Sequence, residues 1–355
     1  MPQADPAEPA LGRDGAAWFG GRLARGVVET SRDPAVLDRG GWWAVVLDFE
    51  GGVRLWRFAE LVEAPLPEPC GRWQAPAHRH WTSSIPREQY LAGVREIRRR
   101  IHAGDVYQVN LCRLVSAPVA SKVDVWALAH RLAVGNPAPY AGVIDVPAVG
   151  DLPATRLVSA SPELFLRRDG DLVESAPIKG TARTPEGLLP KDEAENIMIV
   201  DLVRNDLQRA CRPGTVSVPS LLRVEPHPGL VHLVSTVQGL LAEGRSWPEL
   251  LAATMPPGSV SGAPKSSALR AIADLEPVPR GPYCGGIGWV DTDRVSAALA
   301  VGIRTFWLDR GRVWFGTGAG ITWGSDPEAE WEETELKAAR LVGLAGGDGA
   351  AGPSA

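Results

Sequence analysis

One lysine stands in a setting that could make its amine a nucleophile. Lys179 lies in the segment Ser-Ala-Pro-Ile-Lys-Gly-Thr at 175–181. A lysine amine attacks carbon only when it is neutral, and desolvation or a neighbouring positive charge is needed to lower its pKa toward 7. Pro177 and Ile178 could provide that desolvation. From these residues alone, the commoner alternative is an amine in water where a strand meets a turn.

Carboxylates recur at spacings that could bind a hard cation. Glu330 and Glu333 share one face of a helix, where they repel each other unless a cation lies between them. Mg²⁺ prefers such oxygen ligands. The alternative is that Asp326 and Pro327 open a helix whose first-turn acids only complement its dipole. Glu195, in a second acidic segment, is a further candidate because it precedes an apolar run and could face a pocket.

The composition argues against several classes of partner. The 355 residues carry a formal net charge of −5, which gives no basic footprint for nucleic acid or anionic membranes. The four cysteines include no Cys-x-x-Cys pair, which argues against a zinc site or disulfides and fits a reducing cytosol. The first 20 residues lack a basic start followed by an apolar run, and no later segment reaches membrane-spanning length. We therefore expect a cytoplasmic protein.

The elements that must position these residues are short strands and amphipathic helices. Residues 42–56 predict two strands around a Gly-Gly turn, and 61–80, with four prolines, predict a connector. The apolar stripe over 86–104 predicts a helix. Over 106–114 polar and apolar residues alternate, which predicts a strand that carries Gln108 on its polar face.

Strands outnumber helices and most are joined by turns, which predicts an α+β fold rather than a doubly wound parallel sheet. Further strands are expected over 140–146, 157–167, 171–178, 284–290, 295–306 and 312–318, and further helices over 191–210, 246–254, 263–274 and 327–343. The glycine-rich segment 316–320 lacks the following helix and ribose-binding acid of a dinucleotide fold. Its amides could cradle a carboxylate or form a plain tight turn.

The chain divides unevenly by composition. Residues 1–15 and 344–355 are low-complexity tails that we expect to be disordered. Residues 16–84 are expected to form a short β-rich subdomain, and 85–343 the catalytic domain that holds the candidate residues.

Six motifs, in chain order, closely resemble those of the chorismate-utilising enzymes. They are Tyr-Gln-Val-Asn-Leu at 107–111, Ser-Pro-Glu-Leu at 161–164, Pro-Ile-Lys-Gly-Thr at 177–181, Glu-Asn-Ile-Met-Ile-Val-Asp-Leu-Val-Arg-Asn-Asp at 195–206, Ser-Gly-Ala-Pro-Lys at 261–265 and Glu-Trp-Glu-Glu-Thr at 330–334. The resemblance covers about residues 85–342 and extends to the large chains of anthranilate, aminodeoxychorismate, isochorismate and salicylate synthases. It implies two β-sheets packed face to face with helices outside.

The resemblance also implies roles for individual residues. Lys179 would add to C2 of chorismate while Glu163, with a pKa raised by burial, protonates the departing C4 hydroxyl. Mg²⁺ would be held by Glu195 and Glu333, with Glu330 close by or acting through water. The positions that would contact the substrate are Gln108, Thr181, His232, Thr254, Tyr283, Arg304, Gly318, Gly320 and Lys337. For His232, the surrounding residues alone favour a core histidine.

Two positions bear on the product that the resemblance implies. Relatives that add water to the ring carry a lysine base where this chain has Gln108, and an amide cannot take a proton from water at neutral pH. Anthranilate synthases usually carry alanine where this chain has Lys179, whereas lysine is the mark of aminodeoxychorismate synthase component I. The expected product is therefore 4-amino-4-deoxychorismate, the precursor of 4-aminobenzoate and folate. Anthranilate formation, with amination at C2 and loss of pyruvate, is the alternative, and a noncatalytic protein of this fold is a third possibility.

The source of ammonia is expected to lie outside these residues. None of the four cysteines stands in the Gly-x-Cys-x-Gly setting of a glutaminase nucleophile. Ammonia would then come from a separate glutamine amidotransferase subunit or from solution. The region before residue 85 is short for the family, and it shows no recognised tryptophan-binding pattern.

Overall fold

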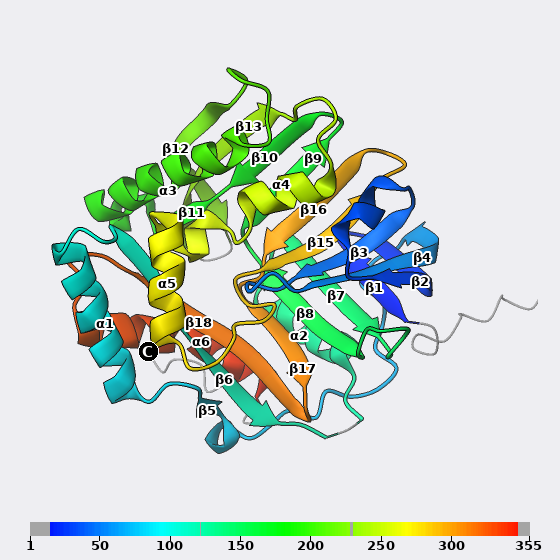
Figure 1. Ribbon diagram of the computed structural model, residues 1–355. Helices are drawn as coiled ribbons and strands as arrows, with labels where there is room; N and C mark the ends of the chain where they lie inside the picture. Colours follow the sequence, from blue (N-terminus) through cyan, green and yellow to red (C-terminus); the bar gives the residue numbers. More distant parts are fainter. Residues whose placement is uncertain (1–14, 121, 228–229, 347–355) are drawn as a thin grey trace, which may run out of the picture.

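Antiparallel strands form the framework of the computed structural model, which describes residues 15–120, 122–227 and 230–346 (Figure 1). The strands are β1 (Ala16–Phe19), β2 (Arg22–Ser31), β3 (Trp42–Leu47), β4 (Val53–Glu63), β5 (Thr82–Ser83), β6 (Gln108–Pro118), β7 (Tyr140–Val146), β8 (Thr155–Ser161), β9 (Leu164–Asp169), β10 (Leu172–Ala176), β11 (Ile178–Ala182), β12 (Ser217–His227), β13 (Leu230–Leu240), β14 (Gly262–Ala263), β15 (Gly286–Asp291), β16 (Ser296–Val301), β17 (Thr305–Asp309) and β18 (Arg312–Ile321). The helices are α1 (Arg87–His102), α2 (Val125–Gly135), α3 (Pro190–Gln208), α4 (Trp247–Thr254), α5 (Lys265–Leu275) and α6 (Pro327–Ala345).

The strands pair along one path that doubles back on itself. It runs from β12 through β13, β10, β9, β16, β15, β3 and β4 to β2, and then through β1, β7, β8, β17 and β18 to β6. The two arms pack face to face, because Trp42 and Val46 of β3 share a buried cluster with Ile144 of β7 and Leu157 of β8. The prediction of an α+β fold with packed sheets is confirmed.

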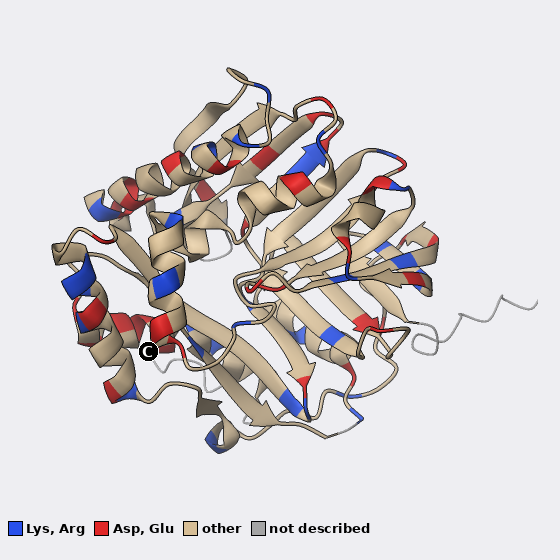
Figure 2. Ribbon diagram, viewed as in Figure 1, with Lys and Arg blue, Asp and Glu red and all other residues tan. Residues whose placement is uncertain are grey.

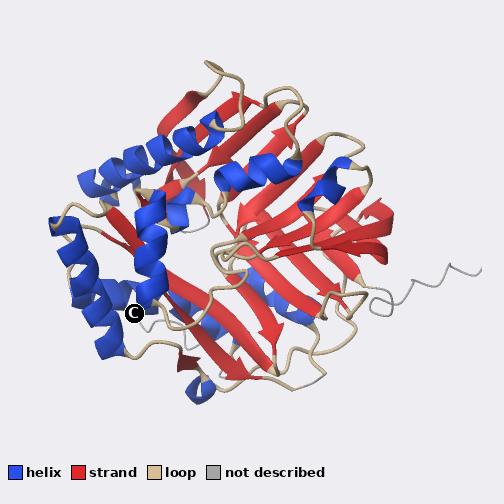
Figure 3. Cartoon of the chain, in the orientation of Figure 1, coloured by secondary structure: helices blue, strands red, loops and turns tan. Residues whose placement is uncertain are grey.

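Helices cover the outer faces of the strand layers (Figure 3). Trp126 of α2 and Leu341 of α6 pack in one cluster with Phe306 and Phe315, which belong to β17 and β18. A larger cluster joins α1, α3, α4 and α5 to the strands that carry the candidate residues. Acidic and basic residues are interspersed over the ribbon in Figure 2, in keeping with the small net charge.

Local signals place the helix ends where the sequence predicted them. Pro86 precedes α1, and Gly104 follows it with φ +83°, a conformation that favours glycine. The Asp326 carboxylate accepts hydrogen bonds from the Glu328 and Ala329 amides at 3.1 Å and so caps α6. The Asp326 cap therefore fixes the start of α6, the helix that carries Glu330 and Glu333.

Three predicted strands prove to be pairs of strands. The segment 157–167 breaks into β8 and β9 at Pro162, and 171–178 breaks into β10 and β11 at Pro177, because proline cannot donate to a ladder. The segment 295–306 breaks into β16 and β17 around Arg304, whose φ of +51° interrupts the extended backbone. These breaks matter because Glu163 and Arg304 both lie at them.

Other expectations need correction or lie outside the described residues. The glycine-rich segment 316–320 is not a turn: it lies within β18 and pairs with β6. The connector predicted over 61–80 begins later, because β4 runs to Glu63, and α6 extends into the carboxyl-terminal tail predicted from residue 344. Strands β1, β2, β12 and β13 and helix α2 were not predicted. Residues 1–14 and 347–355 of the two predicted tails lie outside the described residues, and the domain boundary at residue 84 stays a prediction.

Candidate active site

Lys179 is partly buried at an irregular point of β11. The register between β11 and β13 shifts between Ile178 and Thr181, and Gly180 has φ +88°. Burial lowers the pKa of the Lys179 amine, although Glu195 and Glu163 act in the opposite direction. Desolvation therefore outweighs the attraction of two acids, and the amine is not the exposed one that the isolated motif also allowed.

Glu163 lies between β8 and β9, immediately after Pro162, and is 4% exposed. Burial raises the pKa of its carboxyl to about 7, against the opposing effects of a Ser259 hydrogen bond, the Lys179 charge and the Ile178 amide. The Val301 amide donates a hydrogen bond to the Glu163 carbonyl at 3.0 Å, which holds the backbone at this position. Opposite pKa shifts in neighbouring groups, an acid shifted up and an amine shifted down, are the pattern expected of an acid and nucleophile pair.

Gln108, at the start of β6, has a buried amide without a hydrogen-bond partner. The residue is 1% exposed, and neither its nitrogen nor its oxygen is paired with any described residue. A β-carbon added to Gly320 would lie 2.3 Å from the Gln108 Nε2 and 3.6 Å from the Lys179 Nζ. The absence of a side chain at position 320 thus keeps the space between amide and amine open, and the unpaired amide indicates a polar ligand there.

Carboxylates from two helices face one another beside this space. Burial raises the pKa of Glu195 on α3 and of Glu330 on α6. Burial acts in the same direction on Glu333, but Lys337, whose Nζ lies 2.6 Å from its carboxylate, and then Lys191 and Lys179 bring the Glu333 pKa below its usual value. The Lys337 amine also donates to the Gly318 carbonyl at 3.1 Å.

The chemistry of this cluster suits a hard cation. Its donors are carboxylate oxygens, which Mg²⁺ prefers, and the charge of Glu333 acts on both Glu195 and Glu330. Within the described residues, no three carboxylate, imidazole or thiol groups are gathered closely enough to hold a metal ion. The carboxylate oxygens of these residues are the kind of ligand that suits Mg²⁺, but the Glu333 carboxylate is paired with Lys337.

The remaining predicted residues divide into two groups. Thr181 and His232 lie together, with 2.8 Å between Oγ1 and Nδ1, on paired positions of β11 and β13. Arg304 makes no ion pair with any described residue, and burial and then Arg340 lower the pKa of its guanidinium. These positions suit anion binding.

Thr254 lines the same small cavity as Glu163, whereas Tyr283 belongs to the largest buried cluster. The Thr254 hydroxyl donates to the Leu250 carbonyl of its own helix at 2.8 Å. The Tyr283 ring packs where a β-carbon on Gly316 would lie, in the largest buried cluster. The substrate contacts expected of both side chains stay predictions.

The sequence matches a known family over most of its length. The family described as chorismate binding enzyme matches residues 53–343. The chain belongs to the chorismate-binding enzymes. The anthranilate synthase component 1 of Thermus thermophilus is 40% identical over 82% of this chain and 64% of its own length. The aminodeoxychorismate synthase component 1 of Escherichia coli is 37% identical over 74% of this chain and 58% of its own length.

Solved structures agree on the fold of this chorismate-binding enzyme. The anthranilate synthase component I of Streptococcus pneumoniae aligns with TM-score 0.77 at 23% identity, over 96% of this chain and 94% of that one. The menaquinone-specific isochorismate synthase of Escherichia coli aligns with TM-score 0.78 at 19% identity, over 95% and 90%. The chain spans roughly half to two thirds of the length of the curated relatives named above. No helix among the described residues is long and apolar enough to cross a membrane.

The structure also adds residues to the site that sequence reasoning missed. Ser259, in the turn after α4, lines one cavity with Glu163 and acts to lower the pKa of its carboxyl. Lys265 binds Asp206 at 2.5 Å and the carbonyls of Thr254 and Pro256 at 3.1 and 2.8 Å. The signal for Ser259 was its place two residues before the Ser-Gly-Ala-Pro-Lys motif, although nothing in the sequence showed that it meets Glu163.

Proposed function

We propose that this chorismate-binding enzyme aminates chorismate at C4 with ammonia to give 4-amino-4-deoxychorismate, for 4-aminobenzoate and folate synthesis. The observation that carries the proposal is the pairing of Lys179 and Glu163, a buried amine of lowered pKa beside a buried carboxyl of raised pKa. An amine that is neutral can attack a ring carbon, and a carboxyl that is protonated can release a hydroxyl as water.

The proposed reaction has two steps, the addition of Lys179 and then the addition of ammonia. The Lys179 nitrogen forms a bond to C2, the ring double bonds shift, and the C4–O bond breaks as Glu163 gives its proton to the departing hydroxyl. Ammonia then bonds to C4, the double bonds shift back, and the C2–N bond to Lys179 breaks. Glu163 recovers a proton from the entering ammonia, so that chorismate and ammonia become 4-amino-4-deoxychorismate and water.

Other groups would hold the substrate during both additions. The unpaired amide of Gln108 faces the reacting space, and Arg304 and Lys337 offer positive charge for carboxylates. Glu195 and Glu333, with Glu330, are the residues that would hold Mg²⁺, which when bound supplies positive charge for the ring carboxylate. We further propose that a glutamine amidotransferase supplies the ammonia.

Product identification tests the proposal directly. The purified chain would be incubated with chorismate, Mg²⁺ and ammonium at pH 8.5, with and without a lyase that converts aminodeoxychorismate to 4-aminobenzoate. We expect 4-aminobenzoate only with the lyase, detected by mass spectrometry and fluorescence. Fluorescent anthranilate formed without the lyase would overturn the proposal and support the alternative that the Thermus thermophilus relative suggests.

A lysine variant tests the covalent step. Lys179→Ala should lose aminodeoxychorismate formation by about 1000-fold or more while still binding chorismate, because the nucleophile is removed. When the wild type is mixed with chorismate but no ammonia, intact-protein mass spectrometry should show that the protein mass has increased by the mass of chorismate less water. The exposed Lys122→Ala is the matched control and should keep both signals. Full activity in Lys179→Ala would exclude the adduct.

A further inference from the structure

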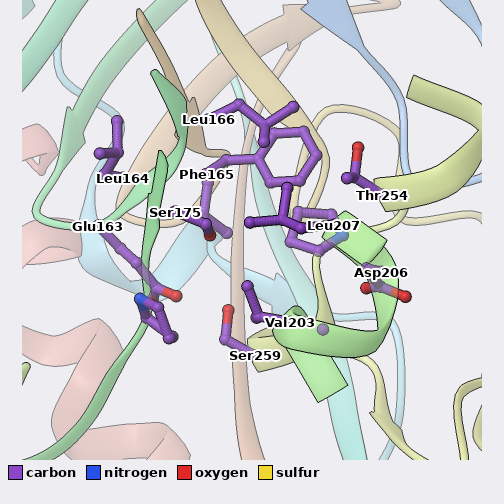
Figure 4. A pocket seen from close by; sticks show the side chains of 14 residues that line it. Glu163, Leu164, Phe165, Leu166, Ser175, Val203, Asp206, Leu207, Thr254 and Ser259 are labelled. Atoms are coloured by element: carbon purple, nitrogen blue, oxygen red, sulfur yellow. The ribbon is translucent and has the colours of Figure 1, made fainter. Parts of the chain in front are cut away.

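Ser259 contacts the Glu163 carboxyl from the wall of a small cavity (Figure 4). The cavity has about 10 Å³ of free space, enough for a single water-sized sphere. Figure 4 shows the Ser259 hydroxyl and the Glu163 carboxyl directed toward each other, with Asp206 on the opposite side. Ser259 is 7% exposed, and a hydroxyl buried this deeply is costly to leave unpaired. The Glu163 carboxyl is the polar group that this hydroxyl faces in the cavity.

The backbone that carries Ser259 is fixed to β6. The Val260 carbonyl accepts hydrogen bonds from the Arg280 guanidinium at 2.9 Å and the Asn110 side-chain amide at 3.2 Å. The next carbonyl, that of Ser261, accepts from the Asn110 backbone amide at 2.9 Å. The hydroxyl is therefore a fixed donor, whose position is set by the same strand that carries Gln108.

Three elements bring charged or polar groups to Glu163. Lys179, on β11, is the nearest cation, and the Ile178 amide donates to the carboxyl from the same strand. Across the cavity, Asp206 on α3 is compensated by Lys265 at 2.5 Å and Arg209 at 3.1 Å. The contact from the turn after α4 is a neutral donor, so Ser259 can orient the carboxyl without adding charge.

We propose that Ser259 is a positioning residue, whose hydroxyl donates to Glu163 and holds its carboxyl in the orientation that exchanges a proton at the substrate C4 position. The role in catalysis rests on the proposed function. The same hydrogen bond favours the ionised carboxylate and thus opposes burial. A carboxyl that must first give and then recover a proton works best when neither form is strongly preferred.

Two substitutions separate this role from packing. Ser259→Ala should lower kcat about tenfold or more, leave KM for chorismate within about twofold, and move the inflection of the kcat/KM pH profile near pH 7 upward by about one pH unit, because a donor to the ionised form is lost. Ser259→Thr, which keeps the hydroxyl, should restore both rate and inflection. An inflection that stays in place in Ser259→Ala, or a failure of Ser259→Thr to restore it, would overturn the proposal.

A second readout does not depend on the product. The stability difference between wild type and Glu163→Gln grows from about pH 4.5 and levels off at the pKa of folded Glu163, so the pH of that plateau reports the folded pKa by linkage. In the Ser259→Ala background the difference should level off at a pH about one unit higher. Ser259→Cys, with a weaker donor of similar size, serves if the alanine variant does not fold, and its plateau should shift in the same direction. If the wild type makes no aminodeoxychorismate, the proposed function fails, whereas an unshifted plateau removes Ser259 from its role whatever the product.

Discussion

Replacing Glu163 with glutamine should stabilise the protein above neutral pH. The unfolded chain releases the Glu163 proton near pH 4.5, and the folded protein releases it near pH 7. Between these values unfolding releases a proton, so the free energy of unfolding falls by about 1.36 kcal/mol per pH unit and the fall totals about 3 kcal/mol. The loss is complete above pH 7 and absent below pH 4.5. Glutamine carries no charge to desolvate, so Glu163→Gln should escape the loss.

The assay is chemical denaturation of wild type and Glu163→Gln between pH 4.5 and 8.5. The difference in unfolding free energy should be near zero at pH 4.5 and should favour the variant by about 3 kcal/mol at pH 8, with most of the change below pH 7. The exposed Glu243→Gln is the control and should differ from wild type by less than about 0.5 kcal/mol throughout. A difference for Glu163→Gln that does not vary with pH would refute the claim that burial controls this carboxyl.

Three further substitutions test other parts of the site. Gly320→Ala places a β-carbon 2.3 Å from the Gln108 Nε2. Because that amide is the end of a flexible side chain, thermal melts should show a change in stability of less than about 1 kcal/mol. Steady-state kinetics should show that kcat/KM falls about tenfold or more. Asp206→Asn leaves a buried lysine unpaired and should destabilise by about 3 to 5 kcal/mol, whereas the exposed Asp201→Asn on the same helix should cost less than about 0.5 kcal/mol in the same denaturation assay. Glu333→Gln should raise the Mg²⁺ concentration for half-maximal activity about tenfold or more, and an unchanged metal titration would remove Glu333 from the proposed metal site.

All the helices except α2 could be predicted from the sequence because their signals are local. The apolar stripe of α1 and the Asp326 cap of α6 act within a few residues of where they are written. The ends of the strands were harder to predict, because a single residue such as Pro162 or Arg304 divides one apolar segment into two strands. Strand β12 was missed because residues such as Leu221 and Val224 stay exposed, so that no buried face shows as a clear alternation.

The sequence could predict which residues belong to the site from their types, but it could not predict the environment of each side chain. Lys179 could be singled out from its neighbours, yet its lowered pKa comes from burial, with β13 and α3 packed against β11, and persists against the opposing effect of acids distant in sequence. The unpaired state of the Gln108 amide depends on Gly320 across the ladder. Ser259 could not be assigned, because its hydrogen bond to Glu163 joins two turns that no local pattern connects.

The pairing of β18 with β6 also determines when, during synthesis, the protein can become active. Gly318 lies opposite Cys112, about 200 residues earlier, and the next element, α6, carries Glu330 and Glu333. A nascent chain therefore exposes an unpaired edge of β6 until β18 has left the ribosome, and that edge is open to pairing with other chains in the meantime. Non-local pairing of this kind slows folding, so we expect activity to appear only after β18 and α6 have left the ribosome.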